Sequence, residues 1–269
     1  MVVQHNMTAM NANRMLGITT STQAKQTEKL SSGYRINRAA DDAAGLSVSE
    51  KMRRQIRGLD QASANAQDGI SLVQSAEGAL SEVSDMLQRM NELSVKAANG
   101  TYTTVQTQYI ADEINQLNSE IDRIATTTKF NDQTVLDNTS SFTFQVGNES
   151  GETMTVAMKS MKKADIGLSD QTWSAAGAAS SYITTIKTAM EKVASHRSAL
   201  GAVQNRLEHT INNLDNIVEN TTAAESRIRD TDMAKSMVTY SNNQILAQAG
   251  QAMLAQANQT NQGVLSLLQ

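Results

Sequence analysis

The chain has 269 residues, a formal net charge of −4 and only 3% aromatic side chains, and it contains neither cysteine nor proline. Disulfides and cysteine-ligated zinc sites are therefore excluded, three scattered histidines do not favour a metal site, and the acidic balance argues against nucleic-acid binding. The sequence has no apolar run long enough to span a membrane, and residues 1–17 lack the features of a secretory signal. Few aromatic side chains favour a long helical protein with narrow aliphatic seams over a thick globular core.

Residues 1–32 predict a terminal helix that is weakly amphipathic, with Met7, Met10 and Ile18 among its apolar side chains. Residues 33–42 predict a connector. It ends in Asp41 and Asp42, whose carboxylates are suited to capping the first turn of a following helix.

A much longer helix is predicted from Ala43 to a stop at Asn99-Gly100, because glycine tolerates the left-handed cap. Two apolar rows recur every seven residues, which is typical of a helix that supercoils against a partner. These rows are Met52, Leu59, Ala66, Val73, Leu80 and Leu87, and Ala62, Gly69, Ala76, Val83, Met90 and Ala97. A helix of this length needs long partners.

Two partner helices are predicted further along the chain. Thr103 and Gln106 form a capping-box pattern that opens a shorter helix, which completes a segment of bundle helices over 43–137. Residues 182–229 carry a third apolar row: Ile186, Val193, Leu200, Leu207 and Leu214. Together these stripes predict one long antiparallel bundle with heptad seams.

Between these helices, residues 138–181 change character. Phe142, Phe144 and Val146 alternate with polar residues, and Met154 to Met158 alternates again after a glycine-rich turn. This pattern predicts a small β-hairpin that leans on the bundle, because a lone hairpin is unstable. Ser169–Ser181 predicts a loop.

Residues 230–269 predict a second terminal helix with an unusual surface. From Ser236 to Gln269 there is no charged side chain, and the polar faces are rich in Asn and Gln. We predict that both terminal helices order only against each other, as a coiled coil, and against copies of the same chain. The candidate polymerisation-core residues are Met7, Met10, Ile18, Met233, Tyr240, Ala247, Leu254, Val264 and Leu268.

Several stretches carry a specific resemblance. They run from Leu30 to Leu46, Ser49 to Leu72, Leu200 to Leu214, Ala223 to Asp230 and Met253 to Leu268. With these signatures, about five sixths of the chain resembles bacterial flagellin, in a short form without variable outer domains.

The resemblance implies a structural subunit of the bacterial flagellar filament, with no enzymatic activity, cofactor, catalytic residue or metal site. It implies an extracellular protein that is exported unfolded through the flagellar type III channel and polymerises under a cap. The implied partners are other flagellin subunits, the filament cap and hook-junction proteins, and an export chaperone at residues 236–269. Neither nucleic acid nor membrane insertion is expected.

The resemblance also implies a surface that Toll-like receptor 5 recognises on the monomer. The matching positions are Gln88, Arg89, Glu92 and Leu93 on the long helix, with Glu113 on its neighbour. An arginine beside a leucine at i, i+4 is suited to anchoring a protein partner. Ordinary solvated charges are the competing interpretation of Arg89 and Glu92.

The sequence leaves two other structural functions open. A hook–filament junction protein would share the terminal features but have a longer middle. A signalling coiled coil would also show Ala-rich heptads, yet it would carry charges along its whole length, whereas residues 236–269 carry none. An enzyme is disfavoured, because no group of polar residues points to a convergent site.

Overall fold

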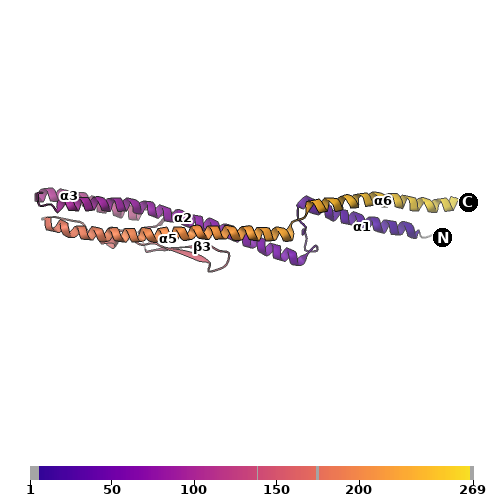
Figure 1. Ribbon diagram of the computed structural model, residues 1–269, viewed down its shortest axis with the longest axis horizontal. Coiled ribbons are helices and arrows are strands. Elements are labelled where there is room, and N and C mark those ends of the chain that lie inside the picture. The colour runs from indigo at the N-terminus through magenta and orange to yellow at the C-terminus, as the bar shows by residue number, and fades with distance from the viewer. Residues whose placement is uncertain (1–5, 138, 174–175, 267–269) are drawn as a thin grey trace. The chain divides into compact units, whose positions relative to one another are not determined.

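The computed structural model describes residues 6–137, 139–173 and 176–266, with the side chains of 176–178 and 261–266 not described. It confirms a mainly α fold with long helices and a small β-hairpin (Figure 1). The helices are α1 (Met7–Ser32), α2 (Ala43–Ala97), α3 (Thr104–Thr127), α4 (Lys163–Ile166), α5 (Ala176–Arg229) and α6 (Met233–Ser266). The strands are β1 (Lys129–Phe130), β2 (Gln133–Thr134), β3 (Ser141–Gln145) and β4 (Thr153–Ala157).

The chain divides into two compact units, and α2 and α5 contribute to both. The first unit comprises Met1–Ile56 and Glu219–Gln269, and the second comprises Arg57–Val218. From the sequence, the terminal segments are predicted to be residues 1–32 and 230–269, with boundaries where one helix ends and the next part of the chain begins. The first unit also takes in the start of α2 and the end of α5, because side chains there contact the connector.

The helix ends of the first unit follow the expected capping chemistry, with one difference. Asp42 Oδ1 accepts a hydrogen bond from the Gly45 backbone N–H at 2.9 Å, so Asp42 caps α2. Asp41 instead accepts from the backbone N–H groups of Arg38 and Asn37, at 3.1 and 3.2 Å. These bonds hold the pKa of Asp41 below its ordinary value. Asp41 therefore closes the connector and does not cap the helix.

The second unit is built on the predicted heptad rows. Their members on α2 and α5 form its apolar core, and Val73, Leu80 and Leu87 are fully buried. The α3 helix adds Ile114 and Ile121 to the same core. Its capping box is confirmed, since Gln106 N–H donates to Thr103 Oγ1 and Thr103 N–H donates to Gln106 Oε1. The long helix ends at Ala97, just before the predicted stop.

The predicted hairpin is also confirmed and lies on α2. Strands β3 and β4 pair antiparallel, with Phe144 opposite Met154. Asn65 of α2 donates from Nδ2 to the Gln145 carbonyl at 2.9 Å. A side chain at Gly69 would come within 3.4 Å of the Phe144 ring, so the glycine lets the hairpin approach the helix. The inward residues of β4 join the apolar core.

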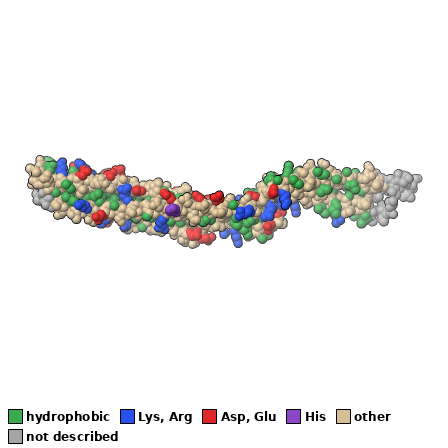
Figure 2. All heavy atoms as spheres, in the orientation of Figure 1, with side chains coloured by type: hydrophobic (Ala, Val, Ile, Leu, Met, Phe, Trp, Pro, Cys, Tyr) green, Lys and Arg blue, Asp and Glu red, His purple; other side chains and the backbone are tan. Residues whose placement is uncertain are grey.

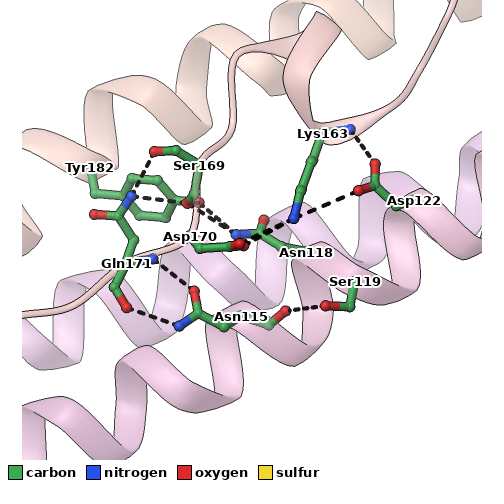
Figure 3. Close-up of polar contacts among 9 residues, drawn as sticks. All are labelled: Asn115, Asn118, Ser119, Asp122, Lys163, Ser169, Asp170, Gln171 and Tyr182. Atoms are coloured by element: carbon green, nitrogen blue, oxygen red, sulfur yellow. Dashed lines mark hydrogen bonds and ion pairs between the residues drawn. The ribbon is translucent and has the colours of Figure 1, made fainter.

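The predicted loop at 169–181 is wrong at its end, because α5 begins at Ala176. The preceding segment is ordered by amide contacts with α3 (Figure 3). Asn115 exchanges two hydrogen bonds with the backbone of Gln171, at 2.7 and 2.9 Å. These bonds hold Trp173 in the core, where it is 2% exposed. Sequence composition did not reveal this, because the segment has no apolar periodicity.

Candidate self-association surface

Helices α1 and α6 lie side by side and run in opposite directions (Figure 1). Near one end, Asn6 Nδ2 donates to the carbonyl oxygen of Ala257 at 2.9 Å. Further along, Gly250 faces Leu16, and a Cβ on the glycine would lie 3.4 Å from Leu16 Cδ1. Residue numbers rise on α1 as they fall on α6, which confirms an antiparallel helix pair.

The seam between α1 and α6 is narrow and combines small side chains with a few larger ones that are only half-buried. None of the described side chains on α1 is fully buried. On α6, Ser236 and Ala247 are buried, while Tyr240 and Leu254 are half-buried. Because stabilisation by apolar burial scales with the area removed from water, this seam by itself stabilises the pair weakly.

Most large apolar side chains of these two helices point to solvent instead. Their exposed fractions range from 49% to 69%. They are Met7, Met10, Met15 and Ile18 on α1, and Met233, Met237, Val238, Ile245, Leu246 and Met253 on α6. Figure 2 shows hydrophobic side chains spread over the visible face of this part of the chain. An exposed apolar surface of this extent marks a binding surface.

The structure places the predicted polymerisation-core residues in two groups. Met7, Met10, Ile18 and Met233 are exposed and available to a partner. On α6, Ala247 is buried and Tyr240 and Leu254 are half-buried within the chain itself, as expected for a row that also takes part in the pairing of the two terminal helices, and contact of this row with other chains stays a prediction. The row repeats every seven residues, and periodicity alone does not say which partner covers it. The side chain of Val264 and all of Leu268 lie outside the described residues.

Sequence reasoning missed the more exposed set on α6. Met237, Val238, Ile245, Leu246 and Met253 are spread over more than one face of the helix. Only two pairs among them, 238 with 245 and 246 with 253, repeat at seven residues, so no extended heptad row pointed to them. The available signal was the combination of large aliphatic side chains with the complete absence of charge after Lys235.

One flank of the helix pair carries an apolar groove of about 430 Å³. Met15 of α1 and Leu246 and Met253 of α6 form its apolar walls, and Gly250 and Leu16 lie between them. Its other lining residues are Thr8, Asn11, Ala12, Thr19 and Ala249, so no charged side chain lines it. The groove exists because Ala and Gly occupy positions where α1 and α6 meet.

The base of the helix pair is held by Arg229 at the end of α5. Its guanidinium lies 4.7 Å from the ring centroid of Tyr34, a cation–π contact. Its Nη1 donates to Glu50 Oε1 at 2.9 Å. The Arg35 backbone N–H donates to the Arg229 carbonyl at 2.7 Å. These contacts join the connector to the start of α2 and the end of α5.

The residues predicted to recognise a receptor lie where α2 and α3 meet in the second unit. Gln88, Arg89, Glu92 and Glu113 are exposed. Arg89 Nη2 donates to Glu113 Oε1 at 2.9 Å, and this bond raises the pKa of Arg89 above its ordinary value. Leu93 is only 3% exposed and belongs to the core, which corrects its placement beside Arg89 on the surface. The face is therefore polar.

The histidines do not assemble a site in the part of the chain that the structure describes. His196 is buried, at 1% exposure, and burial lowers its pKa below the ordinary value, with a smaller contribution from Lys159. His209 is exposed, and His5 lies outside the described residues. No three His, Asp or Glu side chains among the described residues come together as metal ligands. None of the described helices has the length and apolarity needed to cross a bilayer.

Comparison with known families gives matches over both ends of the chain. The family described as the bacterial flagellin N-terminal helical region matches residues 3–141. The bacterial flagellin C-terminal helical region matches residues 183–268. Between them, the two matches leave residues 142–182, which carry most of the hairpin and the segment that contacts α3.

Individual relatives align with this chain over their full lengths. A flagellin from Halalkalibacterium halodurans is 54% identical over 271 residues, and a flagellin from Bacillus subtilis is 46% identical over 303 residues, each alignment covering 100% of both chains. The flagellar filament 31.3 kDa core protein of Treponema maltophilum is 49% identical over 286 residues, again with 100% of both chains covered. The crystal structure of Bacillus cereus flagellin is 34% identical, with a TM-score of 0.51, and the match covers 56% of this chain and 88% of that one.

Proposed function

Because this chain belongs to the bacterial flagellin family and is a structural subunit of the flagellar filament, we propose that the exposed surface of α1 and α6 joins each subunit to its neighbours. The observation that carries the proposal is that exposed aliphatic side chains lie on a helix that has no charged residue after its third position, Lys235. Ile245, Leu246 and Met253 are 64%, 57% and 65% exposed on a segment that has no charged residue after Lys235.

Burial of this surface between subunits is favourable for two physical reasons. Each of these large apolar side chains, which still expose 49–69% of their surface, contributes roughly 1–2 kcal/mol when that exposed part leaves water. The polar residues between them are mainly Asn and Gln, whose side chains both donate and accept and so can pair across an interface. Since residues 236–269 have no charged side chain, assembly leaves no unpaired side-chain ion from the part of α6 after Lys235 in the interface.

Deletion of Ser236–Gln269 tests the proposal. The shortened chain should stay soluble and helical, because the core of the second unit lies outside the deleted segment. It should not polymerise when seeded with filament fragments of the full chain. Filaments of the shortened chain in electron micrographs would contradict the assignment.

A point variant makes the same test without removing a helix. Leu246→Lys places a charge on the exposed face and should prevent or strongly weaken polymerisation. Gln74→Lys, at an exposed position of α2 in the second unit, is the matched charge control and should polymerise. Equal polymerisation of the two variants, measured by sedimentation, would count against the α6 surface.

Within the cell, we propose that the subunit is exported unfolded through the flagellar type III channel and becomes extracellular. The export chaperone would bind residues 236–269, and the filament cap and hook-junction proteins would contact the assembled subunit. Family membership supports these partners, and the apolar, uncharged C-terminal helix supports a need for a chaperone before assembly. Removing 236–269 should abolish chaperone co-purification while a chain altered at Leu246 alone retains part of it.

A second role is favoured by the geometry around Arg89. We propose that Toll-like receptor 5 recognises the monomer at Gln88, Arg89, Glu92 and Glu113, where the ion pair holds the guanidinium in one position. Arg89→Ala should lower receptor activation by monomers in reporter cells. Arg123→Ala is the control, because Arg123 is similarly exposed and also paired with a glutamate on α3. Equal activation by both variants would exclude the site.

A further inference from the structure

The first unit carries two apolar features on different sides of the same helix pair. One is the groove lined by Met15, Leu16, Leu246, Ala249, Gly250 and Met253. The other is a ridge formed by Val238 and Ile245, which are 62% and 64% exposed. Successive residues of an α-helix are turned by about 100°. Counted from the buried Ala247, Ile245 and Val238 therefore lie on the side of α6 that is turned away from α1, whereas Leu246 and Met253 lie on one flank and Ala249 lies at the edge of the groove nearest the ridge.

From this arrangement we infer that the ridge of one subunit inserts into the groove of the next. The inference rests on the proposed function and specifies which faces meet. Val238 and Ile245 are separated by seven residues and therefore lie in line, two turns apart. Their branched side chains are stiff, so little rotamer freedom is lost on insertion. Met15 and Met253 are flexible side chains that adjust to an inserted partner.

A second copy of this chain is the occupant that the surroundings favour. Neither the groove lining nor the ridge has a charged side chain, and no charge follows Lys235 in the sequence. A charged partner surface would leave an unpaired ion against this groove, which is costly. In a filament of identical subunits, the neighbouring surface that matches it is the ridge of another α6.

The separation of groove and ridge also determines the kind of assembly. If one patch were both donor and acceptor, two chains would satisfy each other and the assembly would stop at a symmetric dimer. Here a subunit whose groove is filled still presents its own ridge. The contact is therefore heterologous and leaves an open end, which generates a helical polymer.

Cysteine cross-linking tests which faces meet, because the natural chain contains no cysteine. Ile245→Cys and Ala249→Cys subunits are mixed, polymerised onto filament seeds of the unaltered chain and oxidised. A disulfide requires α-carbons within about 7 Å, so a mixed 245–249 dimer should appear on non-reducing gels of filaments and be absent from monomers. Each variant is blended with excess unaltered chain, so that polymerisation does not depend on the variants alone.

Ala255→Cys is the matched control for Ala249→Cys, since it is an exposed alanine on the other flank of α6. It should not cross-link to position 245. Cross-links of 245 with 255, or of 245 with itself, in well-formed filaments would overturn the groove-and-ridge contact and leave the proposed function standing. Polymerisation of a chain that lacks residues 236–269 on the same seeds would overturn both.

A groove-filling variant gives an independent readout. Ala249→Phe occupies the groove and should raise the critical concentration for polymerisation about tenfold or more, the effect expected from excluding one buried aliphatic side chain. Ala255→Phe adds the same volume outside the groove and should change the critical concentration much less. Equal effects of the two substitutions would overturn the inference.

Discussion

Replacing Asn118 of α3 by leucine should leave the stability of the second unit nearly unchanged, although the residue is fully buried and makes hydrogen bonds. Its Nδ2 donates to the Ser169 carbonyl at 3.1 Å and to Tyr182 Oη at 3.3 Å (Figure 3). Its Oδ1 is buried and has no hydrogen-bond partner among the described residues. The native amide is therefore only half satisfied.

The expected change in the free energy of unfolding follows from these contacts. Each lost hydrogen bond costs about 0.5–1.5 kcal/mol, while a buried unsatisfied acceptor costs about 1–3 kcal/mol in the native protein. Leucine removes both the bonds and the unsatisfied acceptor. The Ser169 carbonyl keeps hydrogen bonds from Gln171 Nε2 and Tyr182 Oη, so no new unpaired group is created. The opposing contributions cancel to within about 1 kcal/mol.

Asn115→Leu is the matched variant one turn earlier on α3. Both ends of the Asn115 amide are bonded to the Gln171 backbone, so leucine there unpairs a backbone N–H and a carbonyl. We expect a loss of about 2 kcal/mol. Urea denaturation followed by the fluorescence of Trp173, the single tryptophan, reports on this region directly, because Trp173 packs edge-on against Tyr182. A loss for Asn118→Leu equal to or larger than that for Asn115→Leu would refute the reasoning.

Three further predictions concern other parts of the second unit. Because burial lowers the pKa of His196, the imidazole takes up a proton at higher pH in the unfolded chain than in the folded one, so the free energy of unfolding should fall as the pH drops below about 6.5. In thermal melts over a range of pH, His196→Gln should remove this dependence, whereas His209→Gln, at an exposed position, should not. Gly78→Ala should stabilise α2 by about 0.5–1 kcal/mol, because no neighbouring atom lies within 4 Å of the added methyl group. Gly69→Ala should raise the stability less or lower it, since its methyl group would lie 3.3 Å from Leu207. Equal shifts in melting temperature for the two variants would contradict this. Thr103→Ala should cost about 1 kcal/mol of unfolding free energy by removing the α3 cap, and an unchanged urea midpoint would show that the cap contributes nothing.

Much of the architecture could be predicted from local chemistry and periodicity. The rows containing Leu80 and Leu200 repeat every seven residues, and such a repeat requires a long helix with a buried seam. The pair Thr103 and Gln106 satisfies backbone groups within three residues of each other, so its capping box needs no distant partner. Alternation around Phe144 predicts a strand for the same reason. These features depend on contacts that are close in sequence.

Which segment buries each helix face could be learned only from the tertiary structure. Periodicity shows that Ala247 and Leu254 share a face, but only the fold shows that α1 covers that face while Ile245 stays exposed. Leu93 likewise has the spacing of a surface residue beside Arg89 and is nevertheless 3% exposed, because α2 is surrounded on more than one side. A helical repeat specifies directions around an axis, whereas burial depends on which segments, distant in sequence, arrive from those directions.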